Sequence, residues 1–95
     1  MLKLFTVRKE LMQNLGMVEI CGNLCFNPSN PGSRFFINNL TEGGMITVED
    51  ARWSEKPNVH IVSYFVWPKN KEDLNKICSE IKHIYSTLCG ARFPE

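Results

Sequence analysis

The sequence predicts a two-layer α+β fold, in which an antiparallel sheet of about four strands carries a C-terminal helix on one face and a short N-terminal helix. Three observations support this prediction. Apolar residues recur at helical spacing near both ends of the chain, they alternate with polar residues in the middle, and clusters of Gly, Pro and Asn separate these segments. A chain of 95 residues has room for one core, so we expect a single domain over 1–95.

The N-terminal helix is predicted between two end signals. The hydroxyl of Thr6 can cap a first turn, and Gly16 stands where a left-handed residue would end the helix. The residues that form the apolar face between them are Val7, Leu11, Met12 and Leu15.

The C-terminal helix has the clearest pattern in the chain. Asn70 is predicted to cap it, and Glu72 and Asp73 place negative charge in the first turn, where the helix dipole favours it. Gly90 stands where the helix would end. The apolar stripe at 3.6-residue spacing consists of Leu74, Ile77, Cys78, Ile81, Ile84, Tyr85 and Leu88.

Four strands are predicted between the helices, over residues 17–26, 34–40, 45–53 and 59–67. Turn residues separate them, including two prolines in 27–33 and paired glycines in 41–44. The first three strands alternate apolar and polar residues, which is typical of a sheet with one buried face.

The fourth strand is apolar on both faces, so both faces need cover. Its odd positions run from Val59 to Trp67, and its even positions include Val62, Tyr64 and Val66. One interpretation is an interior strand whose second face the N-terminal helix covers. Another is an exposed patch of Tyr64, Val66 and Trp67 that binds a second copy or another protein. A third is the floor of a small-molecule site.

The cysteines and carboxylates do not form a recognisable catalytic or metal-binding pattern. Cys21 and Cys25 would stand roughly 13 Å apart in an unbroken strand, too far for one zinc ion with sulfur ligands at about 2.3 Å. The neighbours Glu49 and Asp50 would point to opposite faces of a strand, which excludes an acid–base pair. We therefore predict no catalytic residues, no metal site and no cofactor.

The basic residues give only a weak indication of an anion or nucleic-acid site. The net charge is +1, so the chain as a whole does not attract nucleic acid. Arg34 and Arg52 can lie across the hairpin as anion anchors, yet acidic residues in the same region weaken their attraction for phosphate. Binding of single-stranded nucleic acid is therefore an unfavoured alternative.

The remaining features favour an interaction protein. A loop over 27–33 offers Asn27 and Asn30 as adaptable hydrogen-bonding groups. The first residues contain no secretory leader and no segment resembles a membrane span, so we expect a cytoplasmic protein with reduced cysteines.

We predict a small non-catalytic binding or inhibitory module that contacts a protein partner or a second copy of itself. The expected binding residues are Tyr64, Val66, Trp67, Asn27, Asn30, Arg34 and Arg52. The first alternative is a module that binds a small molecule or nucleotide with the sheet face and the 27–33 loop. A Cys-dependent enzyme is the least favoured alternative.

Overall fold

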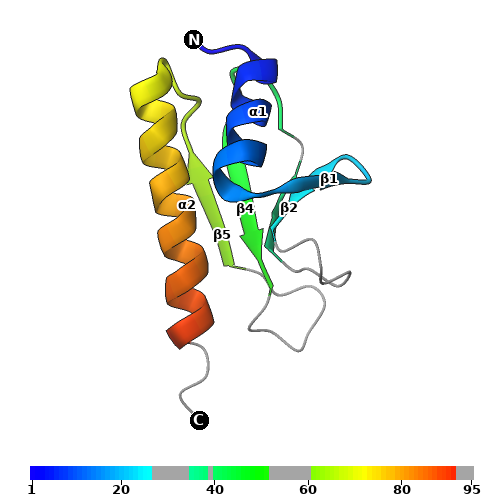
Figure 1. The fold of residues 1–95 in the computed structure, drawn as a ribbon, viewed down its shortest axis with the longest axis vertical. Coiled ribbons are helices and arrows are strands. Elements are labelled where there is room, and N and C mark those ends of the chain that lie inside the picture. The colour runs from blue at the N-terminus through cyan, green and yellow to red at the C-terminus, as the bar shows by residue number, and fades with distance from the viewer. Residues whose placement is uncertain (27–34, 39, 52–60, 92–95) are drawn as a thin grey trace.

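The fold combines one sheet with two helices in the order α-β-β-β-β-β-α (Figure 1). The computed structural model of this chain describes residues 1–26, 35–38, 40–51 and 61–91, and it describes side chains as far as residue 86. Its elements are α1 (Leu4–Leu15), β1 (Val18–Ile20), β2 (Asn23–Cys25), β3 (Phe35–Ile37), β4 (Ile46–Asp50), β5 (Ile61–Phe65) and α2 (Lys71–Ala91). This arrangement confirms the predicted α+β class.

The five strands form one antiparallel sheet in the order β1-β2-β3-β4-β5. Each strand pairs with its neighbour in the chain, so the sheet is a meander. The 41–44 turn joins β3 to β4 as predicted, with the Gly44 amide donating to the Thr41 carbonyl at 2.9 Å. The strands at the two ends of the sheet are β1 and β5.

The predicted strand over 17–26 is wrong, because the chain turns back on itself at Cys21 and Gly22. Both residues have positive φ, 52° and 85°, and Ile20 pairs with Asn23 on either side of them. Two central residues with positive φ define a type I′ hairpin turn. One predicted strand is therefore two, β1 and β2, which raises the number of strands from about four to five.

The start of α1 also differs from the prediction. Thr6 lies inside the helix, and the N-cap residue Lys3 makes no side-chain capping bond. The carboxylate of Glu42, in the turn between β3 and β4, instead accepts a hydrogen bond from the Leu4 amide at 2.6 Å. The end is as predicted, since Gly16 is left-handed with φ 67°.

The C-terminal helix confirms the predicted N-terminal cap. The Asn70 side-chain oxygen accepts the Asp73 amide at 2.9 Å, and the Asn70 carbonyl accepts the Leu74 amide at 3.1 Å. Gly90 does not end the helix, because α2 extends to Ala91.

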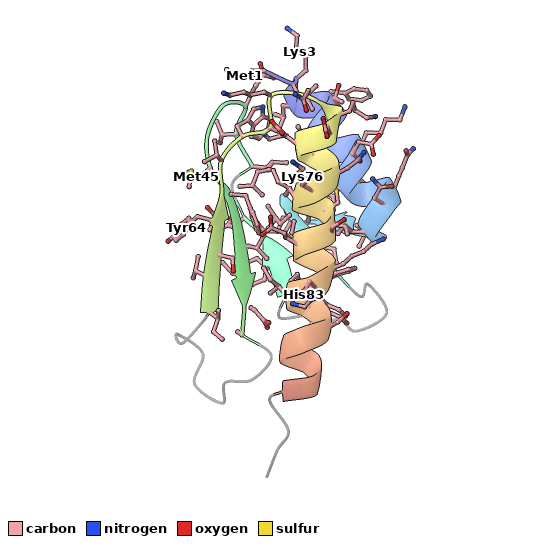
Figure 2. The ribbon with its side chains drawn as sticks, turned by 90° about the vertical axis from the view of Figure 1, so that its left-hand side faces the viewer. Met1, Lys3, Met45, Tyr64, Lys76 and His83 are labelled. Carbon is pink, nitrogen blue, oxygen red and sulfur yellow. The ribbon has the colours of Figure 1, made fainter. Side chains whose placement is uncertain are left out.

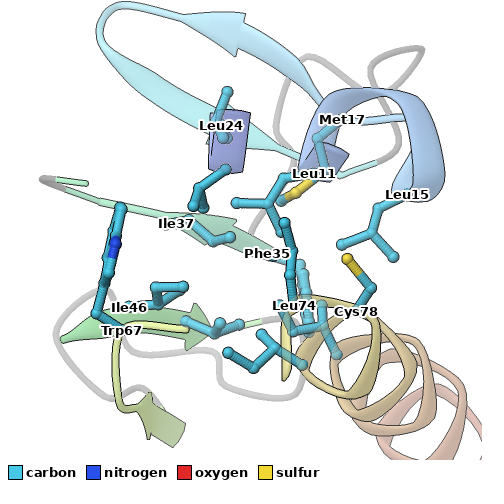
Figure 3. Close-up of a cluster of buried hydrophobic side chains, with 14 residues drawn as sticks. Leu11, Leu15, Met17, Leu24, Phe35, Ile37, Ile46, Trp67, Leu74 and Cys78 are labelled. Atoms are coloured by element: carbon cyan, nitrogen blue, oxygen red, sulfur yellow. The ribbon is translucent and has the colours of Figure 1, made fainter. Parts of the chain in front are cut away.

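Both helices pack on the same face of the sheet. The buried core combines apolar side chains of α1 and α2 with Leu24, Phe35 and Ile37 of the sheet (Figure 3). Figure 2 shows the two helices on one side of β4 and β5, with Met45 and Tyr64 on the other. The interpretation in which the N-terminal helix covers the second face of the fourth strand is therefore wrong.

None of the helices within the described residues is long and apolar enough to cross a membrane.

Candidate functional site

The face of β4 and β5 that lies away from the helices carries a group of exposed apolar side chains. We call this group the open-face patch. Its members and their exposed fractions are Met45 (48%), Val62 (38%), Tyr64 (62%) and Val66 (71%).

The pairing of β4 with β5 brings these residues together. Thr47 lies opposite Tyr64, and Glu49 lies opposite Val62. The next step in the same register places Met45 opposite Val66. Because successive side chains of a strand point to opposite faces, these residues share the face opposite Ile46 and Val48, which are 0% and 1% exposed.

Sequence reasoning identified half of the open-face patch. Tyr64 and Val66 are exposed, as the second interpretation of the fourth strand expected. Met45 and Val62 were missed as binding residues. The signal for both was their position: Val62 alternates with Tyr64 along β5, and Met45 shares the face of Thr47.

Trp67 does not belong to the patch. Its side chain is only 6% exposed, and its indole N–H donates to the Leu2 carbonyl at 2.7 Å. Trp67 is three positions from Tyr64 and one position from Val66, so in an extended chain its side chain points to the opposite face, toward the helices, as that of Phe65 does. The prediction of Trp67 as a contact residue is therefore wrong.

The other predicted binding residues, Asn27, Asn30, Arg34 and Arg52, lie outside the described residues. His60 also lies outside the described residues, and so does the side chain of Cys89.

The outer edge of β5 adjoins the open-face patch. Among the described residues, β5 pairs only with β4, on one of its two sides. An edge strand leaves alternate amides and carbonyls without a sheet partner. The site thus combines an apolar face with an adjacent row of backbone hydrogen-bonding groups.

Two cysteine thiols are poorly suited to catalysis. Burial raises the pKa of Cys25, and the nearby Cys21 raises it further. Burial also raises the pKa of Cys78, against a smaller opposing effect of the hydrogen bond with Asn14. A raised thiol pKa reduces the fraction of reactive thiolate. Cys21, Cys25 and Cys78 are all free thiols.

The carboxylates and grooves do not indicate another site. Asp50 is 1% exposed on the helix side, whereas its neighbour Glu49 lies on the open face, so the two point apart as predicted. No group of three or more His, Cys, Asp or Glu side chains in the described part of the chain could hold a metal ion. A groove of about 360 Å³ lies along α1, where an ion pair joins Arg8 to Glu19.

No protein family, curated protein or solved structure matches this chain.

Proposed function

We propose that this chain is a non-catalytic binding module that contacts another protein through the open-face patch. The observation that carries this proposal is that both helices cover the same face of the sheet, which leaves Tyr64 and Val66 more than 60% exposed on the other. Contiguous apolar groups on a monomer surface are typical of protein contact sites.

The composition of the patch supports a protein partner rather than a small ligand. Tyrosine and methionine are enriched in protein interfaces, and charged residues are depleted at their centres. The four members of the patch are uncharged and project from the face of a sheet, and Val66 also borders a groove of about 280 Å³ beside α2. A small molecule is normally bound in a concave pocket that buries most of its surface.

The free thiols support a reducing compartment, and we place the module in the cytoplasm. Cys25 and Cys78 are buried and belong to different elements, so each is part of the packing rather than of a disulfide. Unpaired cysteines persist where glutathione and thioredoxin keep thiols reduced.

The experiment uses a photo-crosslinking amino acid at position 64 of the full chain in its native cells. A defined partner should be captured from this position and not from Ser79, which is exposed on α2. The purified partner should then bind the Tyr64→Lys/Val66→Lys variant at least about ten-fold more weakly than the unmodified protein.

The matched control is Phe5→Lys. Phe5 is 74% exposed, as much as Val66, but it lies on α1. The control should bind the partner with unchanged affinity. Equal loss in both variants, or equal capture from positions 64 and 79, would contradict the proposal.

A further inference from the structure

The two edges of the sheet differ in their protection against pairing with another strand. At one edge, β1 has only three residues, and its central Glu19 is exposed and forms an ion pair with Arg8. At the other edge, β5 has five residues, Ile61 to Phe65, with neither a charge nor a proline. Short strands, charges and prolines are the usual means of blocking edge-to-edge pairing. Of these two strands as the structure describes them, β1 has such protection and β5 does not.

The β5 edge is also open to approach. Figure 2 looks toward this edge, and α2 lies in the helix layer beside β5 without crossing in front of it. Ile61 and Val62 are each 38% exposed. A second strand can therefore reach the outer amides and carbonyls of β5 without moving α2.

We propose that two copies of this chain pair antiparallel through β5, about a two-fold axis at Ser63, so that their sheets become continuous. Ser63 is the central residue of β5. Symmetry about it places Tyr64 opposite Val62 of the second copy, and Val62 opposite its Tyr64. The inference rests on the proposed function, because it also makes the open-face patch part of a protein contact. It adds that one partner is a second copy of this chain.

The residues of β5 are complementary to themselves in this register. On the open face, two aromatic–β-branched pairs form, a combination that stabilises antiparallel strands. On the helix side, Ile61 lies opposite Phe65 of the second copy. A two-fold axis makes each favourable contact occur twice, which is why this kind of interface is the commonest in homodimers.

The helix layer supplies the additional area that the dimer needs. A stable interface buries about 800 Å² from each partner. That is a substantial share of the 5885 Å² that the whole chain exposes, and a single five-residue strand does not supply it. Beside Phe65, α2 borders a groove of about 280 Å³ with Lys76 and Glu80. An antiparallel second α2 presents the same two charges in reverse order, which lets unlike charges face each other.

The experiment compares two double variants that differ only at position 64. One is Val62→Lys/Tyr64→Lys, and the other is Val62→Lys/Tyr64→Glu. Because Val62 lies opposite Glu49 within the chain, the new lysine has an acidic neighbour in both. Across the proposed axis, the first variant brings like charges together and the second brings opposite charges together. Sedimentation equilibrium measures the dimer dissociation constant, and far-UV circular dichroism checks that both variants fold.

The unmodified protein should dimerise, the like-charge variant should dissociate about 100-fold more readily, and the opposite-charge variant should recover at least about ten-fold of that loss. The recovered affinity should fall in about 0.5 M salt, because salt screens exposed charges.

Two results would overturn the inference. If the unmodified protein stays monomeric at about 100 µM, a dimer with a dissociation constant below that concentration is excluded. Two variants that change the dissociation constant equally, or not at all, exclude the Ser63 register. Neither result bears on capture of a different protein at position 64, so the proposed function is tested separately.

Discussion

Cys21 holds a backbone conformation that few side chains tolerate. Its φ of 52° is the only positive value among the non-glycine residues that the structure describes. The type I′ turn requires this value at its first central residue, where asparagine is favoured because its short polar side chain tolerates the left-handed region. The side chain at position 21 is exposed and lies in no packed layer. Holding Cys21 in this conformation therefore costs free energy, and no packing contact of its side chain requires a cysteine there.

Replacement of Cys21 by asparagine should stabilise the protein. The variant forms an Asn-Gly turn, and the free energy of unfolding should rise by about 0.5–1 kcal/mol. Urea denaturation at fixed pH measures the change. The Cys21→Ala variant is the control, because alanine has no polar group to favour the left-handed region. A lower urea midpoint for the asparagine variant than for the alanine variant would contradict this account of the turn.

Alternation along β5 was enough to predict part of the candidate site. Tyr64 and Val66 occupy even positions of the fourth predicted strand, and both are exposed. The same alternation assigns Trp67 to the opposite face, so the predicted group of Tyr64, Val66 and Trp67 combined side chains from both faces of the strand. The hydrogen bond from its indole to Leu2 joins residues 65 positions apart in the chain. No local pattern in the sequence indicates a contact of that range.

A polar contact outside the core also joins the two helices. Lys71, at the start of α2, donates to the Glu10 carboxylate of α1 at 2.6 Å. This hydrogen bond is the main cause of a lowered pKa of Glu10, which also accepts a hydrogen bond from Asn14. The carboxylate is thus more stable as an anion in the folded chain than in the unfolded chain.

The contribution of this ion pair to stability should depend on pH. Because folding lowers the pKa of Glu10, the stabilisation is fully present above its ordinary value of 4.5 and is lost as the pH falls through the folded value. The Lys71→Met variant should therefore be less stable than the unmodified protein at pH 7, and the difference should shrink in acid. Urea denaturation across this pH range measures it.

The matched control for this prediction is Lys82→Met, which removes an exposed lysine of the same helix that has no acidic residue three or four positions away. Its effect on stability should stay constant over the same pH range. A difference between Lys71→Met and the unmodified protein that persists undiminished in acid would show that Lys71 acts through packing rather than through its charge.

Element boundaries were predictable where a local signal marked them. The cap at Asn70 is such a signal, since an asparagine side chain binds an amide three residues ahead. The start of α1 is not, because its first amide binds Glu42 in a distant turn. The β1–β2 turn was missed because cysteine before glycine is a weak turn signal and apolar residues continue on both sides of it.

At the scale of the whole molecule, one core on one side of the sheet holds both helices and strands β2, β3 and β4 together, and Phe65 of β5 packs against it. Phe35 is central to it, 1% exposed, with its ring 5.5 Å from that of Phe26 and 5.1 Å from that of Tyr85. The sequence predicts the α+β class because amphipathic elements must bury their apolar sides. It does not determine which face receives α1, since an apolar stripe indicates burial and not the surface that provides it.

Adjacent phenylalanines on β3 test this one-sided core. Phe35→Ala should lower the free energy of unfolding by about 3–5 kcal/mol, because it removes a fully buried ring from a packed layer. Phe36 is half-buried on the open face, opposite Glu49, so Phe36→Ala should cost clearly less. Thermal and urea denaturation compare the two. Equal losses would mean that the open face is as tightly packed as the helix side.

The contact between the N-terminal residues and the β5–α2 junction has a consequence for how the chain folds. The meander can form strand by strand, since each strand pairs with the one before it. The Leu2 amide, however, donates to the Pro68 carbonyl at 3.3 Å, and the Leu2 carbonyl accepts the Trp67 indole. During synthesis on the ribosome, this closure must wait until residue 68 has left the exit tunnel. Leu2 is therefore synthesised well before the residues that hold it in place.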